Sequence, residues 1–230
     1  MKTTFALCCP FLFVLALAPA RAAIVETHNF NSLNLDIPDG SPSGLANVQN
    51  FATAINLISD VDVSIHIVGT PDANPFAFNG DLYVYLVHES GFAVLLNRVG
   101  AIFGVPFGYD DNGVMIVLDD AAPNGDVHLY RNVVTPALGA PLTGTWRPDG
   151  RATDPNVVLN TDPRTALLGS FNGLNAAGNW TLFVADASNG EEHRLADWSL
   201  TITGENVPEP GMGLLLASGG MLLFRRCRGR

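Results

Sequence analysis

Short runs of alternating apolar and polar residues recur through the middle of this 230-residue chain, and they constrain its fold more than any other feature. A period of two places apolar side chains on one face of a strand. Each run is bounded by Gly, Pro, Asn or Asp, which favour turns. The sequence therefore predicts an all-β fold, a single antiparallel β-sandwich of the jelly-roll kind. The runs are residues 61–68, 81–87, 114–118, 180–184 and 198–202.

The N-terminal segment, residues 1–22, has the features of a secretory signal peptide. Lys2 precedes an apolar run over residues 5–18, and the small residues Ala20 and Ala22 mark a cleavage site that would leave Ala23 as the first residue. The alternative, a permanent membrane anchor, is disfavoured because the apolar run is too short to span a bilayer. The middle segment, residues 23–206, is expected to form one domain.

The C-terminal segment, residues 207–230, combines a short motif, an apolar run and a basic tail. Pro208-Glu209-Pro210 is followed by residues 211–224 without a charge and then by an arginine-rich end. As a helix the apolar run would cover roughly 21 Å, which is short of the ~30 Å hydrocarbon core. The basic tail beyond this short transmembrane-like helix is expected to stay cytoplasmic.

This order of features resembles the PEP-CTERM sorting signal of Gram-negative bacteria, carried here by Pro208, Glu209 and Pro210. In that family an exosortase-type sorting enzyme recognises the motif, and the tail is thought to be removed on the way to the cell surface or the extracellular polysaccharide. The resemblance implies export, transient anchoring in the inner membrane and a final location at the cell surface or outside the cell. A plain tail anchor with a chance motif is the alternative.

The middle segment is strongly acidic and has no cysteine. It contains six arginines, no lysine and 21 Asp or Glu residues, which gives a net charge of −15. Phosphate backbones and anionic lipids would be repelled by such a body, so we expect no nucleic-acid binding. The lack of thiols excludes a disulfide scaffold, a cysteine zinc site and a cysteine nucleophile from this segment.

Three stretches resemble the P domain, also called the homo B domain, that follows the catalytic domain in subtilisin-like proprotein convertases. The resemblance extends over about residues 35–204 and implies a β-sandwich associated with a secreted serine endopeptidase. It departs from the family in an insertion over residues 69–79 and in the residues before Leu195, so the local loops are expected to differ from those of the family. The three stretches are Ile37-Pro38-Asp39 with residues 58–63, the strand Gly80-Asp81-Leu82 onward to Leu86, and residues 171–202 with Trp180 and Trp198.

No catalytic constellation is recognisable, so we expect the protein not to be an enzyme. The middle segment leaves no room for a convertase catalytic domain, and Ser170 is not in the register of a nucleophile elbow. The five histidines lack metal-ligand spacing. Paired carboxylates such as Asp110 and Asp111 leave a stand-alone hydrolase as a remote alternative. Trp180 and Trp198 are expected in the core, whereas Trp146 is expected to form an exposed contact.

Several aspartates lie at predicted strand ends, where their oxygens could bind Ca²⁺. Because P domains of bacterial convertases often carry structural calcium, the resemblance favours such a site. The expected ligands are Asp81, Asp120 and Asp186, which could converge on one rim of the sandwich, with Asp39 and Asp119 as further candidates. The alternative is that each is a solvated turn former.

Together these features predict a non-catalytic, secreted or surface-displayed module that is structural, adhesive or matrix-binding and calcium-stabilised. Its expected partners are an exosortase-type sorting enzyme and either extracellular polysaccharide or surface proteins. An alternative is an accessory subunit that supports a secreted subtilisin-like serine endopeptidase.

Overall fold

The computed structural model describes residues 22–70 and 77–208. Residues 1–21 of the predicted signal peptide, the apolar run and basic tail, and the motif residues Glu209 and Pro210 lie outside these residues. Within the described part of the chain, no helix is long and apolar enough to cross a membrane.

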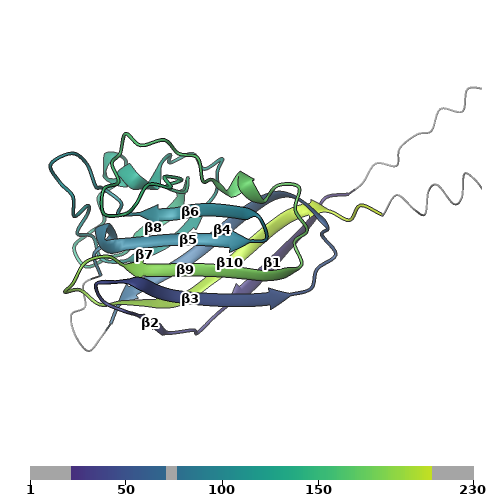
Figure 1. Ribbon diagram of the computed structural model, residues 1–230, viewed down its shortest axis with the longest axis horizontal. Helices are drawn as coiled ribbons and strands as arrows, with labels where there is room; N and C mark the ends of the chain where they lie inside the picture. Colours follow the sequence, from purple (N-terminus) through teal and green to yellow (C-terminus); the bar gives the residue numbers. More distant parts are fainter. Residues whose placement is uncertain (1–21, 71–76, 209–230) are drawn as a thin grey trace, which may run out of the picture.

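Ten strands form two sheets packed face to face, so the predicted β-sandwich is confirmed (Figure 1). One sheet has the order β1-β10-β4-β7-β8, with β2 paired to β10, and the other has the order β3-β9-β5-β6. All five predicted runs lie in strands, except that Asp81, the first residue of one run, belongs to a 3₁₀ turn. The strands are β1 (Ile24–Phe30), β2 (Leu35–Ile37), β3 (Ser41–Phe51), β4 (Leu57–Gly69), β5 (Leu82–His88), β6 (Gly91–Asn97), β7 (Val114–Leu118), β8 (Leu142–Trp146), β9 (Gly178–Asp186) and β10 (His193–Glu205). The 3₁₀ turns are η1 (Asn79–Asp81), η2 (Val127–Asn132) and η3 (Leu168–Phe171).

The expectation of a purely antiparallel sandwich is wrong at one pair of strands. β7 and β8 run parallel, with Val114 opposite Leu142 and Leu118 opposite Trp146. The connection over residues 119–141, which contains η2, returns the chain to the level where β7 began. Parallel neighbours require a long crossover of this kind.

The core lies between the sheets and is built from the apolar positions of the alternating strands. Trp180 and Trp198 are fully buried, as predicted, and their indole N–H groups donate to Ala176 O and Asn47 Oδ1. Trp146 is also buried, at 1% exposure, and its indole donates to Thr143 O, so the prediction of an exposed contact there is wrong. Burial with a satisfied N–H is the usual state of a core tryptophan.

The first and last strands lie side by side, so both ends of the described chain leave the sandwich together (Figure 1). Ile24 pairs with Gly204, and we call this the entry end. β10 begins at the other end, where His193 pairs with Gly69, and we call this the distal end. The 13 residues of β10 separate the two ends by about 40 Å at the usual rise of a strand.

Candidate functional site

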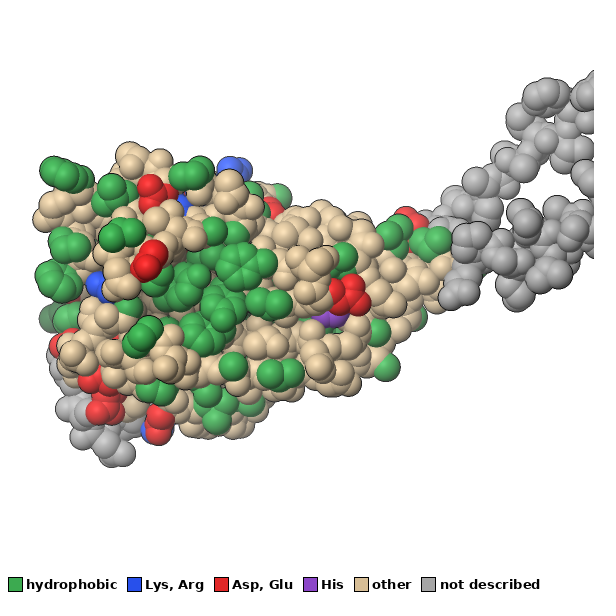
Figure 2. Space-filling view, in the orientation of Figure 1, with side chains coloured by type: hydrophobic (Ala, Val, Ile, Leu, Met, Phe, Trp, Pro, Cys, Tyr) green, Lys and Arg blue, Asp and Glu red, His purple; other side chains and the backbone are tan. Residues whose placement is uncertain are grey.

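Aromatic side chains cover the outer face of the four-stranded sheet. Alternate residues of β5 turn Leu82, Val84 and Leu86 into the core, which leaves Tyr83 and Tyr85 on the other face. The ring of Tyr85 stacks on Phe183 of the neighbouring strand β9, with centroids 4.6 Å apart and planes 14° apart. Figure 2 shows hydrophobic side chains gathered over the middle of this face.

These rings form the floor of a groove of about 700 Å³. One wall is the start of β3 at Gly40 and Pro42, and the other is the loop over residues 152–156. Volumes of this size are typical of small-molecule sites, which are mostly apolar with a few polar groups. The polar groups here include Asp154 and Asn156 in the loop and the phenol groups on the floor.

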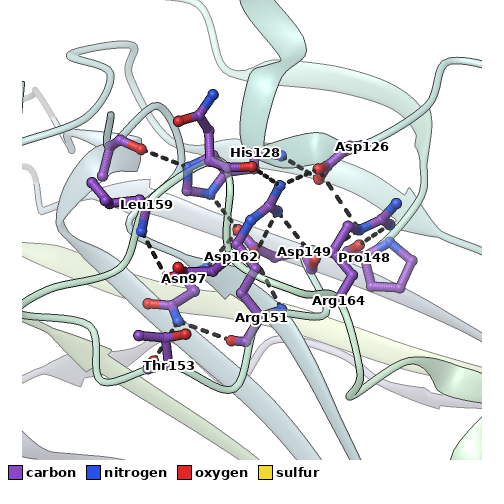
Figure 3. A network of polar contacts seen from close by, with 12 residues as sticks. Asn97, Asp126, His128, Pro148, Asp149, Arg151, Thr153, Leu159, Asp162 and Arg164 are labelled. Atoms are coloured by element: carbon purple, nitrogen blue, oxygen red, sulfur yellow. Dashed lines mark hydrogen bonds and ion pairs between the residues drawn. The ribbon is translucent and has the colours of Figure 1, made fainter. Parts of the chain in front are cut away.

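The loop wall of this groove is fastened to β6 by buried hydrogen bonds (Figure 3). The amide of Asn97, at the end of β6, donates to the carbonyl oxygens of Arg151 and Thr153, both at 2.9 Å. Arg151 in turn donates to Asp126 at 2.7 Å and to Asp149 at 3.1 Å. The wall is therefore positioned by side chains that are far from it in the sequence.

The charges in this network are buried but paired. Arg151 is 3% exposed and Asp149 is fully buried. Burial by itself lowers the pKa of Arg151, but the carboxylates of Asp126 and Asp149 outweigh it and raise the pKa. Arg151 Nε and Asn97 Oδ1 are buried without a hydrogen-bond partner among the described residues, so the network is paired in charge but not fully satisfied in hydrogen bonds. The carboxylate of Asp149 accepts from His128 as well, at 2.7 Å.

The tyrosines on the floor of the groove are partly buried from solvent. Burial raises the pKa of Tyr83, and the neighbouring Tyr85, Asp154 and Asp149 add to the effect. The Tyr83 phenol therefore stays neutral and can both donate and accept a hydrogen bond. Tyr83 also meets Tyr85 edge to face, with centroids 5.7 Å apart.

A second cavity, of about 550 Å³, lies at the distal end and includes Asp81 in its lining. The structure brings two of the three expected calcium ligands together here, because Leu82 of β5 pairs with Asp186 of β9. Asp186 contacts His193 at 2.6 Å, and Asp81 faces Arg98 at 3.8 Å. Burial raises the pKa of Asp81, and the charge of Asp186 adds to the effect.

Asp120, the third expected ligand, belongs to a different cluster, formed with Asp60, Asp62 and Asp119. Its two carboxylate oxygens accept the backbone N–H groups of Leu168 and Gly169, at 3.2 and 2.7 Å, at the start of η3. Burial, followed by the charges of the other three carboxylates, raises the pKa of Asp62 to about 6.

The two remaining candidates accept backbone hydrogen bonds in turns. Asp39 accepts from Gly190 N at 3.0 Å, in the loop that follows Asp186, and Asp119 accepts from Ala121 N at 2.7 Å. Among residues 22–70 and 77–208, no group of three or more His, Cys, Asp or Glu side chains is arranged to hold a metal ion. Of the five candidates, Asp81, Asp186 and Asp39 lie at the distal end, whereas Asp119 and Asp120 lie elsewhere.

The groups considered for catalysis have internal partners. His88, His128 and His193 are buried, and both ring nitrogens of each face acceptor atoms of the protein. Asp110 and Asp111, the paired carboxylates, both accept from Arg131. These contacts indicate a structural role for each of these side chains.

The groove is the site that sequence reasoning missed. Its one signal is in the run over residues 81–87, where the positions that alternate with Leu82, Val84 and Leu86 are Tyr83, Tyr85 and Val87 rather than charged or amide side chains. A strand with one face to solvent would normally alternate. The loop wall, distant in sequence, carries no comparable signal.

Comparison with known proteins finds no matching family model and no matching curated protein. The fold is similar to a crystal structure of the serine protease of Aeromonas sobria, with 16% identity and a TM-score of 0.44 over 83% of this chain and 28% of that chain. It is also similar to the complex of that protease with the chaperone ORF2, with 16% identity and a TM-score of 0.41 over 82% of this chain and 28% of that one. This chain spans less than a third of those solved chains, and the likeness assigns no role to any residue.

Proposed function

We propose that this protein is a non-catalytic binding module, exported and displayed at the cell surface or in the extracellular matrix by a PEP-CTERM and exosortase route. One structural observation supports the proposal most. Because β1 pairs with β10, the segment before Ile24 and the segment after Glu205 both join the body at the entry end. A body held by either segment leaves its distal end free.

The aromatic groove is suited to such display. Ala187 and Ala185 in its lining lie where β9 leaves the sheet at the distal end, away from the sorting segments. A body tethered through the C-terminal segment would therefore hold the groove away from the membrane. The net charge of −15 over residues 23–206 would keep such a body soluble and separate from anionic lipid.

The experiment that tests this proposal replaces Pro208, Glu209 and Pro210 together by alanine in the producing bacterium. Surface labelling and fractionation would measure where the protein accumulates. We expect the parent protein at the cell surface or in the medium and the variant in the inner membrane. Pro163→Ala, a proline replacement in a loop of the body, should behave as the parent. Equal surface display of parent and triple variant would contradict the proposed route.

A second candidate, an accessory subunit of a secreted subtilisin-like endopeptidase, is favoured by exposed apolar side chains in loops at the distal end. Phe103 is 91% exposed, Leu138 97% and Phe107 71%. Contiguous apolar surface often marks a protein contact. A fluorophosphonate probe for serine hydrolases, applied to material captured from the medium, would detect a bound protease. Capture by the parent and loss with Phe103→Ser and Leu138→Ser would support this candidate, and capture of no labelled enzyme would count against it.

A further inference from the structure

The floor of the groove exposes aromatic side chains on the outer face of the sheet. Tyr83, Tyr85 and Phe183 lie on the face of the sheet opposite the core, each partly exposed. The outer face of an antiparallel sheet is normally polar. Three rings on adjacent strands, packed against one another, instead form an apolar surface.

The groove is built before any ligand arrives. Asn97 holds the loop through two backbone carbonyl groups, and Arg151 holds it to Asp126 and Asp149. Ordering a loop on binding costs conformational entropy, and a wall fixed by buried polar contacts avoids that cost. A site of about 700 Å³ with one aromatic floor and one fixed wall suits a ligand chain that has apolar faces and polar edges.

The floor does not offer what an extended peptide needs. Peptides commonly add to a sheet by hydrogen bonding along a free edge. β5 is paired on both sides, to β6 and β9, and β9 is paired to β3 and β5. The floor therefore presents aromatic side chains rather than free backbone groups.

The charges around the groove select against an anionic ligand. Its lining contains Asp154 and no Lys or Arg, and the surrounding body carries −15. A polyanion would be repelled, whereas a neutral polyhydroxyl chain matches the polar groups present. Hydroxyl groups can donate to the Asp154 carboxylate and can donate to or accept from the Asn156 amide.

We infer that this groove binds a neutral polysaccharide, with the apolar faces of sugar rings packed against the aromatic floor of Tyr83, Tyr85 and Phe183 and sugar hydroxyls bonded by Asp154 and Asn156. The inference rests on the proposed function as a displayed binding module and names the ligand class for it.

The test is affinity electrophoresis of the full-length chain, purified in a mild detergent, through native gels. The gels contain dextran, xyloglucan or mixed-linkage β-glucan as neutral probes and alginate as the anionic probe. We expect retardation by at least one neutral probe and none by alginate. Tyr85→Ala should weaken binding about tenfold, which corresponds to about 1.4 kcal/mol for the lost aromatic contact, and Tyr85→Phe should retain most of the affinity.

The matched control is Phe103→Ala, which removes a more exposed aromatic ring outside the groove lining. It should bind as the parent does, and thermal melts of all variants check that each is folded. Three results would each overturn the inference: no retardation by any neutral probe, equal weakening by Phe103→Ala, or retardation by alginate alone. If polylysine included in the gel retards the protein, Tyr85→Ala removes that retardation and the neutral probes do not bind, the occupant is a basic peptide and the inference is also overturned.

This outcome is separable from the fate of the proposed function. Purified protein bypasses sorting, so binding in the gel does not depend on the Pro208-Glu209-Pro210 motif. Normal display without retardation would reject the groove inference alone. Retardation without display would reject the route alone.

Discussion

His128 Nδ1 lies 2.7 Å from the Oδ2 atom of Asp149, and neither side chain is exposed. The other ring nitrogen of His128 faces Ala101 O at 2.9 Å, and the second oxygen of Asp149 accepts from Arg151. Charge-assisted contacts of this kind are stronger than neutral ones. This pair therefore joins η2 to the loop that leads into the groove wall.

Removing the Asp149 carboxylate should destabilise the whole domain. Asp149→Ala leaves Arg151 buried with one fewer anionic partner, and breaking a buried pair in this way typically costs about 3–5 kcal/mol. Urea unfolding would measure the loss. The control is Asp36→Ala, which breaks the pair with Arg194 at a surface site where Asp36 is 69% exposed, and such pairs contribute at most about 1 kcal/mol. Equal losses of unfolding free energy for the two variants would show that the buried network stabilises the domain no more than a surface ion pair does.

Asp62 should make the domain less stable as the pH rises from about 4 to 6. Its folded-state pKa is raised from 3.8 to about 6, mainly by burial and then by Asp60, Asp119 and Asp120. Between these values the folded state binds more protons than the unfolded state, so this contribution to stability falls with rising pH.

Asp62→Asn should therefore be more stable than the parent at pH 7, by about 1 kcal/mol once solvent screening is allowed for. The difference should shrink toward pH 4. Unfolding curves at several pH values would measure it, with Glu89→Gln, an exposed carboxylate outside the cluster, as the control. A difference between Asp62→Asn and parent that stays constant from pH 4 to 7 would refute this assignment.

No group of side chains in the described residues is arranged to hold a metal ion, so CaCl₂ should raise the melting temperature through the accumulated charge of the carboxylates around Asp62 rather than through a formed site. Cations relieve repulsion among Asp60, Asp62, Asp119 and Asp120, and binding to the folded state alone is stabilising. Differential scanning calorimetry in CaCl₂, compared with NaCl at equal ionic strength, separates binding from screening.

Two variants locate the calcium effect. Asp62→Asn should reduce the response to CaCl₂, whereas Asp81→Asn should leave it intact, because Asp81 already faces Arg98. The reverse result would place the ion in the distal cavity with Asp81 and Asp186. Identical melting in CaCl₂, NaCl and EDTA would dispose of calcium altogether.

Gly80 should be intolerant of any side chain. A Cβ atom there would lie 2.1 Å from Phe107 O and 2.7 Å from Tyr109 N, and these are backbone atoms with little freedom to move. Gly80→Ala should cost about 1–3 kcal/mol by overpacking. Gly173→Ala is the comparison, because it meets open space and has only the strain of a φ near +86°, worth roughly 1 kcal/mol. Thermal unfolding that ranks Gly173→Ala as the more damaging change would contradict the packing of this loop.

The strands could be predicted from sequence because their alternation reflects the burial of one face. Directions and pairings depend on the path of the loops, which leave no local pattern. The parallel pairing of β8 follows from the crossover over residues 119–141. The sequence predicts an exposed Trp146 because Gly144 and two threonines make its strand resemble a loop. In the structure Trp146 is buried and packs near Tyr130.

The site could be predicted only in part, for a related reason. Asp81 and Asp186 lie close together because β5, which follows Asp81, pairs with β9. Asp120 instead accepts a hydrogen bond from the backbone N–H of Gly169 in η3. The groove joins Tyr83 to a wall loop around Asp154, and the buried Asn97 that positions this wall carries no signal of that role in the sequence.

Intact mass spectrometry of the protein extracted from the cell surface tests display by the proposed route most directly, because one spectrum reports both chain ends. The proposed route predicts a mature chain that begins at Ala23 and has lost the residues beyond the Pro208-Glu209-Pro210 motif. A mass that retains both residues 1–22 and the arginine-rich end at Arg230, or recovery of the protein only from inside the cell, would contradict it.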